Sequence, residues 1–161
     1  MRSNPFNIIK EIEKKSKEIY PVLLYGNEGG LISKLIKSIY DILHIKVGVN
    51  EIKYFDHGND KNDELNILLK NNSLFSKIIL IVIKNPQEHL VKELDNIKKN
   101  ENIVIINGEG IKANSKIKKY FEDHKNFISV PCYNLDKNTT KKIVDDFLVK
   151  NNIKLQNEAY W

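Results

Sequence analysis

Five short segments of this chain are rich in apolar and aromatic residues, and each is followed or closed by a glycine, proline, asparagine or charged residue. They span residues 21–26, 51–55, 77–83, 102–106 and 127–130. The runs at 77–83 and 102–106 are apolar at nearly every position, which is typical of strands buried on both faces of a parallel sheet. The pattern therefore predicts five strands.

Between these segments, apolar residues recur every three or four positions, which is the spacing of helices with one buried face. Asn4–Pro5 and Asn85–Pro86 each resemble an N-cap followed by proline at the first helical position, and we expect a helix to open at each. Further helices are expected after the first strand and over 63–70, 116–123 and 140–151. The apolar stripes of the three longest are Phe6, Ile9, Ile12 and Ile19; Leu31, Ile32, Leu35, Ile36, Ile39 and Leu43; and Ile143, Val144, Phe147 and Leu148.

Strands that alternate with helices require right-handed crossovers, so the expected fold is of the α/β class: a five-stranded parallel sheet with helices on both faces. The sequence ends just where a new helix is expected to begin. We therefore expect one domain over residues 1–152, with 153–161 as the start of a following domain.

Composition narrows the classes of protein to consider. The chain has 161 residues, 41% of them hydrophobic, and a formal net charge of +5. All of its 26 basic residues except Arg2 are lysines, which form bidentate phosphate contacts less readily than arginine. The single cysteine, Cys132, excludes an internal disulfide and a cysteine-based zinc site. No apolar run is long enough to span a membrane and no signal peptide is recognisable, so we expect a cytoplasmic protein without membrane contact.

The turn after the first strand has the setting of a phosphate-binding P-loop, but its chemistry is incomplete. In the frame G-x-x-x-x-G-K-[ST] that starts at Gly26, the loop continues through Gly30, while Leu31 replaces the second glycine and Ile32 replaces the lysine. Only Ser33 fits. The strand at 77–83 also runs into Lys84–Asn85 instead of an acidic residue that would bind Mg²⁺. These departures predict a degenerate nucleotide site, with no cofactor and no catalytic residues.

One apolar pair has an unusual setting. Leu74 and Phe75 are flanked by Ser73 and Ser76 in a polar connection that leads into the strand at 77–83. A connection of this kind is expected at the surface, where an exposed apolar pair indicates a partner protein. The alternative is that both side chains pack under the sheet as part of the core.

Three stretches together resemble the amino-terminal domain of the bacterial DNA polymerase III delta subunits, a family of clamp-loader subunits. They are Val22 to Leu31, Ser73 to Ser76, and Val130 to Tyr133 followed by Asp136. The resemblance implies an AAA+-like fold that has lost ATP binding, with the residues from 153 on beginning a lid domain. It also implies a clamp-binding element formed by Leu74 and Phe75 with Ser73 and Ser76.

The partners implied by the resemblance are the sliding clamp (beta subunit) and the other clamp-loader subunits of the DNA polymerase III holoenzyme, a DNA-directed DNA polymerase. The chain itself is expected to have no catalytic activity and to help open the clamp for DNA replication. Contact with DNA is expected to be weak and non-specific.

An alternative function is a non-catalytic DNA-binding module on an inactive NTPase fold. It rests on the lysines 112, 116, 118, 119, 141 and 142, but the scarcity of arginine and of interleaved aromatic residues speaks against it. A third class, a transferase on a Rossmann-like sheet, lacks a G-x-G-x-x-G loop. The four histidines are scattered along the chain without a zinc-ligand spacing, so no metal site is expected.

Overall fold

The computed structural model describes residues 2–14, 21–59, 62–70, 78–94, 102–112, 114–134 and 136–154. All five predicted strands are present: β1 (Val22–Gly26), β2 (Glu51–Asp56), β3 (Ile79–Lys84), β4 (Ile103–Glu109) and β5 (Ile128–Pro131). The helices are α1 (Ile8–Lys14), α2 (Gly29–Val47), α3 (Asn62–Lys70), α5 (Lys116–Asp123) and α6 (Lys137–Lys150), with a 3-10 helix, η1 (Glu88–Lys92).

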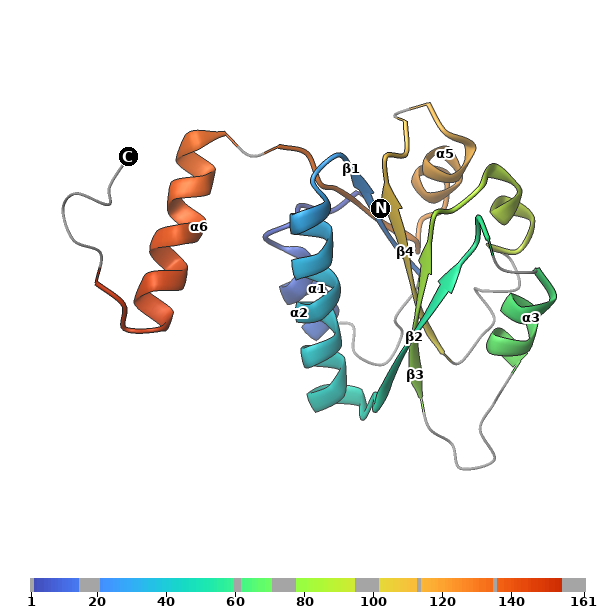
Figure 1. Cartoon of the computed structure of the whole chain (residues 1–161), viewed down its shortest axis with the longest axis horizontal. Coiled ribbons are helices and arrows are strands. Elements are labelled where there is room, and N and C mark those ends of the chain that lie inside the picture. Colours follow the sequence, from blue (N-terminus) through green and yellow to red (C-terminus); the bar gives the residue numbers. More distant parts are fainter. Residues whose placement is uncertain are drawn as a thin grey trace.

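The strands form one parallel sheet in the order β2-β3-β4-β1-β5 (Figure 1). β1 lies between β4 and β5, with Val22 opposite Ile105 on one side and Ile128 on the other. The chain leaves β1 for the far edge at β2, and it leaves β4 in the other direction to form β5. Ligands of open parallel sheets commonly bind at the carboxyl ends of strands where connections diverge in this way, which here means β1 and β4.

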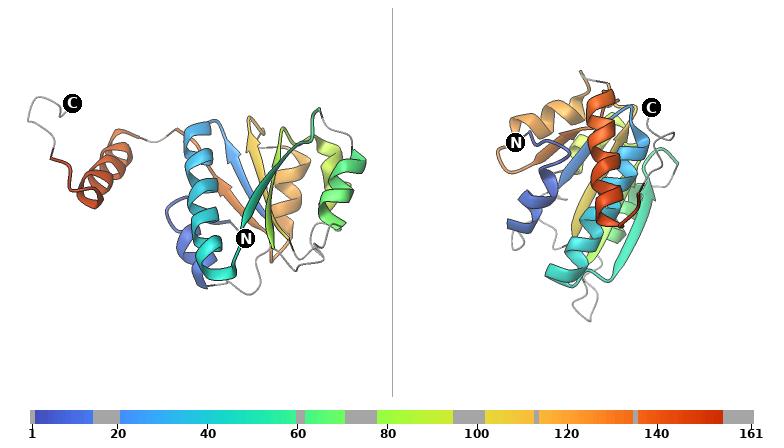
Figure 2. Two further views of the ribbon diagram at one scale, coloured as in Figure 1. Left: turned by 60° about the horizontal axis from the view of Figure 1, so that its bottom comes forward. Right: turned by 90° about the vertical axis from the view of Figure 1, so that its left-hand side faces the viewer.

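Helices cover both faces of the sheet, as the pattern predicts (Figure 2). Alternate residues of each strand point to opposite faces, so β1 contributes Val22 and Leu24 to one core cluster and Leu23 and Tyr25 to the other. The first cluster packs against α1 and α2, and the second against α3, η1 and α5. No helix in the described part of the chain is long and apolar enough to cross a membrane.

The prediction that a helix opens at Asn85–Pro86 is wrong at its start. Asn85 adopts a left-handed backbone conformation with φ of 48°, which an N-cap does not have. Its side chain donates to the Asp56 carboxylate across the ends of β2 and β3, at 2.9 Å. The next helical turn, η1, begins only at Glu88, and Gln87 before it makes no side-chain capping bond. The structure does not describe residues 95–100, where the predicted helix continues.

The last predicted helix is present, but it does not cover the sheet. α6 stands apart from the sheet, on the far side of α2 from the strands (Figures 1 and 2), and none of its residues is buried. Its start is well defined, because the Asp136 carboxylate accepts from the backbone N–H of Thr139 at 2.9 Å and from its hydroxyl at 2.8 Å. These bonds lower the pKa of Asp136. Phe147 nevertheless remains 55% exposed, so the apolar stripe of this helix is not part of the core.

Candidate functional site

Backbone hydrogen bonds to the ends of β5 and β4 hold the turn after β1 closed. The N–H of Cys132 donates to the carbonyl of Tyr25 at 2.6 Å, and the N–H of Glu28 donates back to the carbonyl of Cys132 at 3.1 Å. On the other side, the N–H of Gly110 donates to the carbonyl of Gly26 at 2.8 Å. The turn is thus tied to the ends of β5 and β4, and the N–H of Glu28 points at a carbonyl instead of a phosphate.

Gly26 allows this close approach. Its φ is 141°, a conformation that residues with a side chain rarely adopt, and a Cβ at this position would collide with the backbone of Cys132. The glycine at the start of the degenerate loop therefore serves the contact between the turn and β5.

Two carboxylates lie at the amino-terminal end of α2, where a P-loop protein binds phosphate. Gly29 faces the Glu109 carboxylate so closely that a Cβ on Gly29 would collide with it. Glu28 is the N-cap residue of α2, and its carboxylate lies beside Gly30. Both carboxylates complement the positive end of the helix dipole and repel a phosphate.

The three residues at the last positions of the P-loop frame differ in how deeply they are buried. Ile32, at the position of the P-loop lysine, is fully buried in the cluster between the sheet and α2. Leu31 packs at the edge of the same cluster, whereas Ser33 is exposed. An apolar side chain inside the core cannot present a cation to a nucleotide. That the nucleotide site is degenerate stays a prediction from the sequence.

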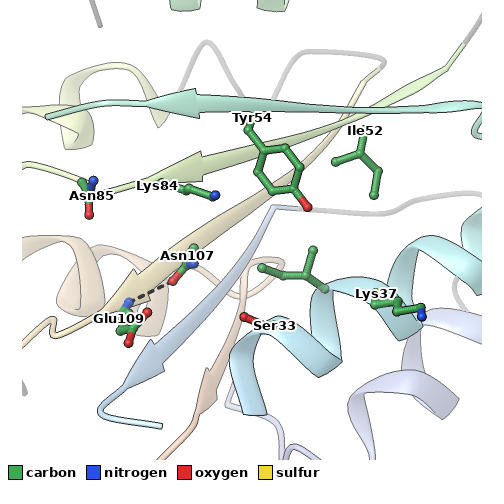
Figure 3. A pocket seen from close by; sticks show the side chains of 9 residues that line it. Ser33, Lys37, Ile52, Tyr54, Lys84, Asn85, Asn107 and Glu109 are labelled. Atoms are coloured by element: carbon green, nitrogen blue, oxygen red, sulfur yellow. Dashed lines mark hydrogen bonds between the residues drawn. The ribbon is translucent and has the colours of Figure 1, made fainter. Parts of the chain in front are cut away.

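A hollow of about 440 Å³ lies next to the closed turn, between α2 and the carboxyl ends of β2, β3 and β4 (Figure 3). Lys84, at the end of β3 where a Mg²⁺-binding acid is missing, places its ammonium group 4.3 Å from the centre of the Tyr54 ring. The other lining residues are Ser33, Ile36, Lys37, Ile52, Asn85, Asn107 and Glu109. Sequence reasoning did not identify this hollow, because its residues come from four separate elements.

The predicted clamp-binding residues Ser73, Leu74, Phe75 and Ser76 lie outside the described residues. The elements on either side of them are well packed: Leu65 and Leu69 of α3 and Ile79 of β3 are buried in the same core cluster. Ile67, on the outer side of α3, is 59% exposed.

Two histidines that are far apart in the sequence meet after β2. The rings of His57 and His89 have centroids 4.4 Å apart. His57 is buried, and its Nδ1 accepts a hydrogen bond from the N–H of Gln87 at 2.9 Å. Burial, and then the neighbouring His89, lower the pKa of His57. Across the described ranges, no group of three or more potential ligands is arranged to hold a metal ion.

The surroundings of the remaining candidates, Cys132 and the lysines of α5, favour a structural role. Cys132 is fully buried, and burial raises the pKa of its thiol to about 12, which makes it unreactive at neutral pH. Among the lysines considered for DNA binding, Lys116 pairs with Glu88 and Lys118 pairs with Glu122, each at 3.0 Å. These pairs weaken the case for the DNA-binding surface that the sequence suggested on α5.

The sheet order, the crossovers and the closed loop before α2 define an AAA+-type fold, as expected from the sequence. Among solved structures, the DNA clamp loader delta protein of Bacillus subtilis is similar, with a TM-score of 0.64 and 16% sequence identity over 91% of this chain and 48% of that chain. Domain III of the Thermotoga maritima replication initiation protein DnaA is also similar, with a TM-score of 0.53 and 14% identity over 95% of this chain and 71% of that chain.

This chain spans about half the length of the clamp loader protein, with 48% of that chain covered. Comparisons with protein-family models and with curated protein sequences find no match. At these identities, the structural similarity defines the fold, and function has to be argued from the site.

Proposed function

We propose that this chain is the amino-terminal part of a delta-type clamp-loader subunit, which binds a sliding clamp and helps to open it without hydrolysing ATP itself. The observation that carries the proposal is an AAA+-type sheet whose phosphate loop is closed by Cys132 and faced by the Glu109 carboxylate. A fold retained without its nucleotide chemistry indicates a role in binding partner proteins. The similarity in fold to a clamp loader delta protein supports this assignment.

In this proposal Leu74 and Phe75 enter an apolar pocket of the clamp, and Ser73 and Ser76 form a polar rim around them. Burying two such side chains gives a gross gain of about 3–6 kcal/mol, at ~1.5–3 each. The buried residues Leu69 and Ile79 hold the described chain on both sides of this segment.

Opening follows from a difference in affinity. If the chain binds the distorted ring more tightly than the closed ring, it shifts the clamp towards the open state by that difference. No chemical step in this chain is needed. ATP acts in the partner subunits of the loader, where it controls whether the clamp-binding surface is accessible.

The proposal is tested by measuring binding of the chain to the sliding clamp of the same organism, with Leu74→Ala and Phe75→Ala combined in one variant. We expect affinity to fall at least about 30-fold, the minimum loss that defines a binding hot spot. Ile45→Ala combined with Val149→Ala is the matched control, because both side chains are apolar and 78% exposed but lie on α2 and α6.

The melting temperature of each variant separates the two interpretations of the Leu74–Phe75 pair. Loss of clamp binding with an unchanged melt supports the anchor. Equal binding by the variant and the native chain contradicts it. A collapsed melt also contradicts it, because large-to-small changes in a core cost about 2–5 kcal/mol each and would place the pair inside the domain.

A further inference from the structure

Polar side chains line the hollow beside α2 because alternate residues of each strand face the same side of the sheet (Figure 3). On the sheet face that packs against α2, β3 presents Leu80 and Val82 to the core and then Lys84, two residues further on. β4 likewise follows Ile105 with Asn107. Each row of core residues thus continues into a polar side chain at the carboxyl edge of the sheet, where ligands of open parallel sheets bind.

Hydrogen-bond donors predominate among the polar groups that line the hollow. Asn107 accepts from the N–H of Glu109 through its side-chain oxygen, at 3.1 Å, which leaves its NH₂ group as a donor. Neither Lys37 nor Lys84 forms an ion pair within the described ranges. Among the described residues that line the hollow, Glu109 is the only acidic one, and it places its carboxylate against Gly29 at the start of α2. The lining therefore carries a net positive charge and favours an anion.

Tyr54 adds an aromatic surface to this donor set. Its side chain is 55% exposed, and the Lys84 ammonium lies 4.3 Å from the ring centre. The ammonium lies over one face of the ring, so a base would stack on the opposite face while Lys84 offers charge to a phosphate. Stacking and charge are the two contacts that proteins use for single-stranded nucleic acids. Ile36 and Ile52 form an apolar wall next to it.

We propose that this hollow binds single-stranded nucleic acid, with a base against Tyr54 and backbone phosphates at Lys84, Asn107 and Lys37. A strand fits better than a free nucleotide. The neighbouring turn cannot wrap a phosphate, because the N–H of Glu28 is already bonded to Cys132. Ser33, Lys37, Tyr54 and Lys84 are all exposed, so the hollow is open to solvent and a strand can reach it. The proposal is independent of clamp binding.

The test is fluorescence anisotropy of a labelled twelve-nucleotide oligothymidylate at about 50 mM salt, where phosphate contacts are strong. We expect Tyr54→Ala and Lys84→Glu each to weaken binding about 5-fold or more, the lower end for loss of one stacked base. Tyr54→Phe keeps the ring and should retain binding. Lys125→Glu is the matched charge control, since it changes an exposed lysine just before β5, at the opposite edge of the sheet.

Three results would overturn the proposal. The first is no binding by the native chain. The second is an equal loss in Lys84→Glu and Lys125→Glu, which would show diffuse attraction by the net charge. The third is displacement of the strand by inorganic pyrophosphate at equal phosphate concentration, which would assign the hollow to a free phosphate ligand. Because Tyr54 and Lys84 are exposed, their variants should melt like the native chain, and melting curves verify this.

Discussion

His57 links the stability of the fold to pH. Its Nδ1 accepts from the N–H of Gln87 and must be unprotonated to do so, while its Nε2 is buried and has no hydrogen-bond partner among the described residues. Burial and the adjacent His89 lower the pKa of His57, and Glu93 and Asp56 oppose this shift in part. The folded state therefore holds a neutral imidazole that the unfolded chain protonates more readily.

The unfolded chain binds more protons than the folded chain once the pH falls to the ordinary histidine pKa of about 6.5. The stabilisation is thus complete above that pH and is lost as the pH falls towards the lowered pKa. We expect the free energy of unfolding, measured with urea, to be lower at pH 5.5 than at pH 7.5. His57→Asn keeps an acceptor for Gln87 without a titratable ring, so its pH dependence should be smaller. An equal pH dependence in both proteins would show that other groups cause the loss.

Gly26 is the residue on which the closed turn depends most. We expect Gly26→Ala to destabilise the fold by about 3 kcal/mol or more, because strain at a positive φ adds to the collision with the backbone of Cys132. Gly48→Ala is the matched control: Gly48 also has a positive φ, 78°, but among the described residues other than its chain neighbours nothing lies within 4 Å of its Cβ position. Chemical denaturation of the two variants compares them directly. Equal losses would mean that the contact with β5 adds nothing.

At the scale of elements, the apolar pattern predicted the strands well, because runs such as Ile79 to Ile83 have no plausible place except a buried sheet. It predicted the presence of α6 but not its position. A helical stripe specifies that one face is apolar and says nothing of which surface covers it. Phe6 shows the same limit, since it fits the first stripe but is 48% exposed.

The site could be predicted only where its chemistry is local. The missing lysine at Ile32 is visible in one sequence frame, and its burial follows from the stripe of α2. The contact of Glu109 with Gly29 and the meeting of His57 with His89 depend on strand order, which brings distant segments together. Asn85 misled the prediction because its bond with Asp56 crosses from β3 to β2.

The exposure of α6 leads to a prediction about domain organisation. Because no residue of α6 is buried, ending the chain after Asn134 should leave the sheet domain folded. We expect its melting temperature to change by less than about 4 °C, a shift that corresponds to ~1 kcal/mol for a domain of this size. Calorimetry of the shortened chain measures this. Loss of the cooperative transition would instead make α6 an essential part of the domain.

At the scale of the whole molecule, the two proposals concern different parts of the chain. The proposed clamp anchor precedes Ile79, which begins β3, whereas the hollow of Tyr54 and Lys84 opens at the carboxyl ends of the strands. The proposed contacts with protein and with nucleic acid can therefore be tested separately. Neither requires the closed loop after β1 to bind a nucleotide.

The most direct measurement of the central claim is the release of a labelled sliding clamp from nicked circular DNA after addition of this chain. We predict that release accelerates with the concentration of the chain and has the same rate with and without Mg-ATP. Leu74→Ala combined with Phe75→Ala should abolish the acceleration. Release that requires Mg-ATP, or a clamp that stays on the DNA at saturating chain, would contradict the account.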